Sequence, residues 1–118
     1  MQFTETVKAS LLDDGFVELS LERTYPHGAK YMPTVYFQVL DVPELADAIE
    51  RFARTTVPET VPLSDGEVNL FCMTPNPLIN LELKRPSFGE HGGYRCIDMG
   101  PKTVPSLVAA LREAADQF

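Results

Sequence analysis

Basic and aromatic side chains gather near the ends of the segments in which polar and apolar residues alternate. Lysine and arginine bind phosphate groups, and an exposed ring can stack on a nucleobase. Together they supply the chemistry that recognition of single-stranded nucleic acid requires. The candidate residues for such a site are Lys8, Arg23, Tyr25, Lys30, Tyr31 and Tyr36 in the first half of the chain, and Lys84, Arg85, Phe88, Tyr94, Arg95 and Lys102 in the second.

Residues suited to catalysis or metal binding form no comparable pattern. Cys72 and Cys96 do not make a C-x-x-C pair, and no Ser/His/Asp or Cys/His constellation is recognisable. Gly89, Gly92 and Gly93 lack the Gly-Lys-Ser/Thr ending of a phosphate-binding loop. We therefore expect no catalytic residue, no metal and no cofactor, and a protein that is not an enzyme.

The charge of the chain limits the partners that it can bind. The 118 residues include 10 Lys and Arg against 17 Asp and Glu, which gives a net charge of −7. This balance argues against binding of duplex DNA through charge alone. Because many of the acids fall on the expected helices, we predict acidic helices behind a less acidic sheet face; these acids are Asp41, Glu44, Asp47, Glu50, Glu113 and Asp116.

The length and composition are those of a single globular domain. A mass of 13.1 kDa with 44% apolar residues allows one hydrophobic core. No apolar run approaches the ~20 residues of a membrane span, and the first residues do not resemble a signal peptide. With only two cysteines, we expect an intracellular, cytoplasmic protein with reduced thiols and no membrane partner.

The sequence repeats itself with a shift of 62 residues. Leu19, Leu21 and Arg23 recur as Leu81, Leu83 and Arg85, and Val42-Pro43 recurs as Val104-Pro105. Such self-similarity indicates a duplicated structural unit. We divide residues 1–118 into a first repeat at 1–54, a linker rich in Thr and Pro at 55–66, and a second repeat at 67–118.

Each repeat reads as antiparallel strands followed by one helix. Period-2 alternation predicts strands at 7–11, 17–21 and 35–39 in the first repeat, and at 71–73, 79–83 and 97–99 in the second. Asp13-Asp14-Gly15 and Pro75-Asn76-Pro77 are typical of turns.

The helices begin after Asp41 and Thr103, each followed by a proline in its first turn, and Glu44 completes a capping box with Asp41. The predicted fold class is α+β, with two pseudo-symmetric units (ββββα-like twice) in which each helix covers its own sheet. The chain would then be a pseudo-dimer in itself, with further oligomerisation left open.

This arrangement resembles the positive cofactor four family of transcriptional coactivators and the similar plant Whirly proteins. The resemblance rests on Val7 to Leu11, Asp14-Gly15, Val17 to Tyr25, and the run from Phe37 to Leu45. It implies two paired units of four strands and a helix whose curved sheets bind single-stranded DNA. The family's outward basic position on the second strand falls on Glu22 in the first repeat and on Lys84 in the second.

Two kinds of function follow from these observations. The duplicated unit and its basic strands predict a non-enzymatic protein that binds single-stranded DNA or RNA in replication, recombination or transcription. The net charge and the outward acids Glu18 and Glu82 favour an alternative. It is an acidic protein–protein interaction or inhibitor protein on the same scaffold, whose carboxylates could imitate DNA.

Overall fold

The computed structural model describes residues 2–72, 78–86 and 93–118, and in them the fold is mixed α+β, as predicted. The elements of the first half are β1 (Thr4–Leu11), β2 (Phe16–Thr24), β3 (Lys30–Tyr31), β4 (Thr34–Gln38), the 3-10 turn η1 (Val39–Asp41) and α1 (Val42–Thr55). Those of the second half are β5 (Glu59–Leu63), β6 (Gly66–Cys72), β7 (Ile79–Arg85), β8 (Gly93–Met99), η2 (Pro101–Thr103) and α2 (Val104–Asp116). Four strands and a helix therefore follow one another twice.

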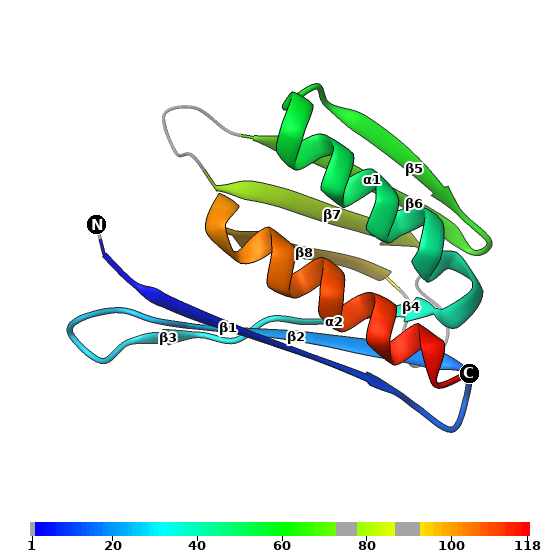
Figure 1. The fold of residues 1–118 in the computed structure, drawn as a ribbon, viewed down its shortest axis with the longest axis horizontal. Helices are drawn as coiled ribbons and strands as arrows, with labels where there is room; N and C mark the ends of the chain where they lie inside the picture. The colour runs from blue at the N-terminus through cyan, green and yellow to red at the C-terminus, as the bar shows by residue number, and fades with distance from the viewer. Residues whose placement is uncertain (1, 73–77, 87–92) are drawn as a thin grey trace.

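The strands form two antiparallel sheets (Figure 1). In the first sheet β2 lies in the middle, with β1 on one side and both β3 and β4 on the other. In the second sheet the four strands lie in chain order, β5-β6-β7-β8. Inward residues alternate with outward polar ones, as the period-2 pattern predicts: Val17, Leu19 and Leu21 are at most 1% exposed. The predicted strands at 17–21, 79–83 and 97–99 are thereby confirmed.

The two helices pack against each other and run in opposite directions (Figure 1). The apolar stripes predicted on them are buried, including Leu45, Ile49 and Phe52 on α1. The prediction that each helix covers its own sheet is wrong, because α1 packs on β5 and β6 whereas α2 packs on β1 and β2. Each half of the chain thus supplies the helix that covers the sheet of the other half.

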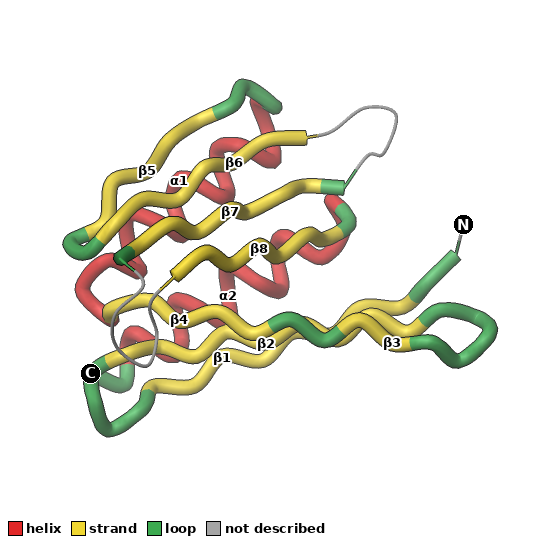
Figure 2. Tube along the Cα trace, turned by 180° about the vertical axis from the view of Figure 1, so that it is seen from behind, coloured by secondary structure: helices red, strands yellow, loops and turns green. Residues whose placement is uncertain are grey.

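The position of β4 and β8 accounts for this exchange. These two strands lie next to each other where the sheets meet, as the view from behind shows (Figure 2). A helix that follows β4 after three residues, or β8 after four, therefore starts beside the opposite sheet. The buried side chains of both sheets and both helices form one continuous hydrophobic core.

The segment at 55–66 is more than a linker. It contains β5, which pairs with β6 along the outer edge of the second sheet. Val61 is 3% exposed and joins the core, while Pro62 faces away from it. Proline is tolerated on an edge strand because its missing N–H has no partner there. The short strand β3, in the loop that holds Gly28 and Pro33, was likewise not predicted.

The helix α1 begins at Val42, close to the predicted start, but the predicted capping box is absent. Asp41 makes no side-chain bond to the first turn of the helix. Its carboxylate instead accepts hydrogen bonds from the backbone N–H of Ser64 at 3.2 Å and from the Ser64 hydroxyl at 2.8 Å. Asp41 therefore ties the start of α1 to the turn between β5 and β6.

The turn at Asp13-Asp14-Gly15 is confirmed. Gly15 has a φ of 84°, a conformation that glycine adopts without strain, and the Asp14 carboxylate accepts the N–H of Phe16 at 3.1 Å. The predicted turn at Pro75–Pro77 lies outside the described residues. Neither helix of the described chain is long and apolar enough to cross a membrane.

Candidate nucleic-acid interface

Arg23, at the end of β2, is buried where the two sheets meet. Its side chain is 3% exposed and donates to the Glu5 carboxylate at 2.7 Å, and to both the backbone oxygen and the carboxylate of Asp98, at 3.0 and 2.8 Å. The guanidinium also lies 4.8 Å from the centroid of the Phe3 ring and 4.9 Å from that of Tyr31. Arg23 thereby connects β1, β2 and β3 of the first sheet to β8 of the second.

The charge of Arg23 is stabilised by these partners. Burial alone would lower the pKa of Arg23, but the hydrogen bonds to Asp98, Tyr25 and Glu5 raise it above its ordinary value. The guanidinium stays protonated and fully engaged with the protein. A nucleic-acid phosphate would have to displace two carboxylates to reach it.

Arg85 occupies the corresponding place in the second half. Its side chain is 4% exposed, forms an ion pair with Asp65 at 3.2 Å and donates to the backbone oxygen of Tyr36 at 2.7 Å. Arg23 and Arg85 are 62 residues apart, and so are the residues whose backbone oxygens they bind, Asp98 and Tyr36. Both arginines therefore join the two sheets, and neither lies on an accessible surface.

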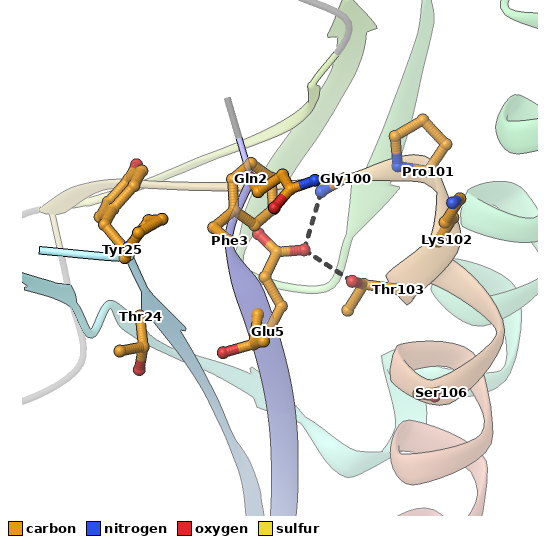
Figure 3. A pocket seen from close by; sticks show the side chains of 12 residues that line it. Gln2, Phe3, Glu5, Thr24, Tyr25, Gly100, Pro101, Lys102, Thr103 and Ser106 are labelled. Carbon is orange, nitrogen blue, oxygen red and sulfur yellow. Dashed lines mark hydrogen bonds between the residues drawn. The ribbon is translucent and has the colours of Figure 1, made fainter. Parts of the chain in front are cut away.

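An open groove of about 1080 Å³ lies beside Arg23, between the start of β1 and the turn η2 (Figure 3). Tyr25 and Lys102, two of the candidate residues, both line it. The rest of its wall is formed by Gln2, Phe3, Thr4, Glu5, Thr24, Pro26, Gly100, Pro101, Thr103 and Ser106. The groove thus brings together one aromatic and one basic candidate from opposite halves of the chain.

The wall of the groove is built around Glu5 and Phe3. One carboxylate oxygen of Glu5 accepts the N–H of Gly100 at 2.9 Å and the hydroxyl of Thr103 at 2.6 Å, as Figure 3 shows. The other oxygen of Glu5 binds Arg23. The ring of Phe3 meets that of Tyr25 edge to face, with 5.9 Å between their centroids. These contacts fix two rings at a place that solvent can enter.

The remaining aromatic candidates are engaged with neighbouring side chains. Burial and the nearby charge of Asp98 raise the pKa of Tyr31. The hydroxyl of Tyr36 donates to Glu18 at 3.0 Å. Tyr94 is 57% exposed and keeps its ring in solvent, while its hydroxyl donates to Glu82 at 2.9 Å, a bond that raises the pKa of Tyr94.

A chain of hydrogen bonds crosses the outer face of the second sheet. The hydroxyl of Thr60 donates to the amide oxygen of Asn69 at 2.6 Å, and the amide nitrogen of Asn69 donates to Glu82 at 3.0 Å. The bonds from Asn69 and Tyr94 lower the pKa of Glu82 below its usual range, and the nearby Lys84 adds to this effect. Glu82 therefore remains a carboxylate at the centre of this face.

The outer faces of the sheets are not a basic surface. Four glutamates occupy outward positions on the described strands against three lysines; they are Glu18, Glu22, Glu67 and Glu82 against Lys8, Lys30 and Lys84. Two of these lysines are already paired, Lys30 with Glu22 at 3.3 Å and Lys84 with Glu82 at 3.4 Å. The predicted contrast between acidic helices and a less acidic sheet face is thus weak among the described residues.

The other candidates are scattered. Lys8, Arg95 and Lys102 are exposed, and Arg95 donates to the backbone oxygen of Tyr94 at 2.9 Å. Phe88 lies outside the described residues. Among the candidates within the described residues, only Tyr25 and Lys102 line the groove.

The sequence prediction missed Phe3 and Glu5, although a signal for both was present. Inward residues of β1 and β2 fall at odd positions, so Phe3, Glu5 and Arg23 share the phase of buried Leu19 and Leu21. The phase alone would have placed these polar and aromatic side chains on the inner face. The partners of these side chains in the second half of the chain depend on how β8 contacts the first half.

Comparison with known proteins adds no family assignment. No protein-family model matches the chain, and no curated protein matches it.

Proposed function

We propose that this chain binds single-stranded nucleic acid without catalysing a reaction, and that the strand docks in the groove between β1 and η2. The observation that carries the proposal is that the groove combines the rings of Phe3 and Tyr25 with the cation of Lys102. A base stacks on an exposed ring, and a lysine neutralises the neighbouring phosphate. The buried arginines Arg23 and Arg85 hold the scaffold and do not contact the ligand.

We also propose that the scaffold is a tandem of two related strand-and-helix units about an approximate twofold axis, similar to positive cofactor four and Whirly proteins. The repeated order of elements supports this. A second support is the pair of bonds from Arg23 to Asp98 and from Arg85 to Tyr36, because donors and acceptors are both separated by 62 residues. Such a pair of equivalent hydrogen bonds, each from one half of the chain to the other, is expected when equivalent residues face each other across a twofold axis.

Fluorescence anisotropy with a labelled oligo-dT strand tests the function at two salt concentrations. We expect salt-dependent binding that is stronger than binding of a duplex of the same length. Replacing Tyr25 by Leu removes a stacking ring, and the loss of about 1–3 kcal/mol per base corresponds to roughly 5- to 150-fold weaker binding. Absence of any binding at low salt would overturn the proposal.

Matched variants separate the groove from the rest of the surface. Tyr25→Phe keeps the ring and loses only the hydroxyl that Arg23 binds at 3.3 Å, so binding should change little. Lys102→Gln should reduce the slope of log affinity against log salt by about 0.7, the value for one phosphate contact on a single strand. Lys84→Gln, on the outer sheet face, should leave the slope nearly unchanged.

A second candidate function is binding of a basic protein partner. The observation that favours it is the excess of outward glutamates over lysines on the sheets, together with the net charge of −7. Leu40, which is 77% exposed on η1, adds an apolar contact point. A chain that ignores oligonucleotides at low salt and forms a stoichiometric, salt-sensitive complex with a basic protein would select this function instead.

A further inference from the structure

The strand β1 forms an open edge of the first sheet. In the described part of the chain it pairs only with β2. It extends for eight residues, Thr4–Leu11, without proline or glycine. The opposite outer strand, β5, has five residues and carries Pro62, which blocks further pairing. Of the two outer edges, β1 is therefore the one built to accept another strand.

The apolar side of β1 is also less covered than its counterpart. Val7 pairs with Leu21 on β2 and is half-buried, whereas Val68, which pairs with Leu83 on β7, is 0% exposed. The difference arises because β5 packs beside β6 and brings Val61 next to Val68. No described strand does the same for Val7, so part of the core remains open along β1.

We propose that two copies of this chain pair through β1, antiparallel and centred on Val7. Among antiparallel registers that keep the inner faces of both copies on the same side of the joined sheet, only those centred on Val7 or Lys8 pair nearly the whole strand. A centre at Lys8 would oppose two lysines. The centre at Val7 opposes two valines on the inner face, a favourable cross-strand pair.

The same register places compatible side chains opposite each other at the remaining positions of β1. Lys8 lies opposite Thr6 of the second copy, Thr4 lies opposite Ser10, and the inward Glu5 lies opposite the small Ala9. No like charges oppose each other, and both edges use the same residues, as a twofold interface requires. Leu11 of the second copy comes beside Phe3 and extends the wall of the groove. The pairing itself does not depend on nucleic-acid binding.

Thr6 offers a test with opposite outcomes. Thr6 is exposed, and the twofold symmetry of the dimer creates two Thr6–Lys8 pairs, one on each side of Val7. Thr6→Lys opposes lysines at both places and should weaken the dimer by about 2- to 30-fold, whereas Thr6→Glu should strengthen it by a similar factor. Sedimentation velocity over a range of concentrations measures both dissociation constants, against a dimer mass of twice 13.1 kDa.

The effect on folding has the opposite sign. Within one chain Thr6 pairs with Glu22 of β2, so lysine at position 6 favours the folded monomer and glutamate disfavours it. A weaker dimer for Thr6→Lys therefore cannot result from poorer folding. Thr60→Lys, on the other outer edge at β5, is the matched control and should leave the dissociation constant unchanged.

Hydrogen exchange gives an independent measurement. Raising the concentration of the intact chain should protect backbone amides of β1 and leave those of β5 unaltered. The proposal is overturned if the wild type and Thr6→Glu both stay monomeric at the highest concentration. It is also overturned if a dimer forms whose stability does not respond to the Thr6 variants, because another surface then carries it.

Discussion

Replacing Arg23 by methionine should destabilise the fold strongly. Methionine keeps the apolar length of the side chain but removes the charge that Glu5 and Asp98 share. The side chain of Glu5 is 2% exposed, so little water can reach its carboxylate once the arginine is gone, although Gly100 and Thr103 still donate to it. Breaking such a buried ion pair on one side costs about 3–5 kcal/mol, a large fraction of the ~5–15 kcal/mol that stabilises a domain.

Arg85→Met is the matched comparison, because Arg85 holds the equivalent junction in the second half. Its partner Asp65 is 25% exposed, so water can hydrate the carboxylate once the arginine is gone. We expect a smaller loss, about 1–2 kcal/mol. Adding Glu5→Gln to Arg23→Met should recover part of the loss by removing the uncompensated charge.

Urea unfolding followed by far-UV circular dichroism measures these differences, provided that the dependence of the unfolding free energy on urea stays constant between variants. The reasoning is refuted if Arg23→Met loses less than about 1 kcal/mol, or no more than Arg85→Met. The first result would mean that the buried network does not hold the sheets together, and the second that the deeper burial of Glu5 does not set the cost.

Three further perturbations test other parts of the structure. The hydrogen bond from Asn69 lowers the pKa of Glu82, so the Glu82 carboxylate stabilises the fold above about pH 4.3. This stabilisation is lost as the pH falls through the lowered pKa. Glu82→Gln should therefore lower the melting temperature at pH 7 and not at pH 2. Leu107→Ala, at a side chain with 0% exposure, should cost about 2–5 kcal/mol in urea unfolding. Gly66→Ala should cost about 1–3 kcal/mol, because the added carbon would overlap the backbone oxygen of Lys84.

Controls for these variants come from the same elements. Ser106→Ala changes an exposed position next to Leu107 and should stay within about 0.5 kcal/mol of the wild type. A melting temperature of Glu82→Gln that falls equally at both pH values would contradict the assigned role of its charge. Wild-type stability for Gly66→Ala would contradict the close approach of β6 and β7.

The elements with strong periodicity could be predicted from the sequence. Alternation identified β2 and β7, and the spacing of apolar residues identified both helices and their buried stripes. The strand β5 was missed because a short edge strand tolerates Pro62, and the Thr- and Pro-rich composition therefore resembles a linker. The helix exchange could not be predicted, since periodicity shows which face of a helix is buried and not which sheet covers it.

The candidate site was harder to predict than the fold. Their residue type predicts that Arg23 and Arg85 bind nucleic acid, yet both continue the inward phase of their strands. An inward arginine at the end of a strand can form an ion pair with another element if that element places a carboxylate within reach. That carboxylate comes from a distant part of the chain, Asp98 for Arg23 and Asp65 for Arg85, so no local pattern reveals it.

The exchange of helices has a consequence for synthesis of the chain on the ribosome. The stripe of Leu45, Ile49 and Phe52 stays uncovered until β5 and β6 have emerged, and the first sheet stays uncovered until α2 has emerged. Neither half can therefore complete its core alone, so we expect both halves to fold together once α2 has emerged. If the chain is cleaved at residues 56–58, each fragment should be unfolded when separate, and mixing the two fragments should restore the structure.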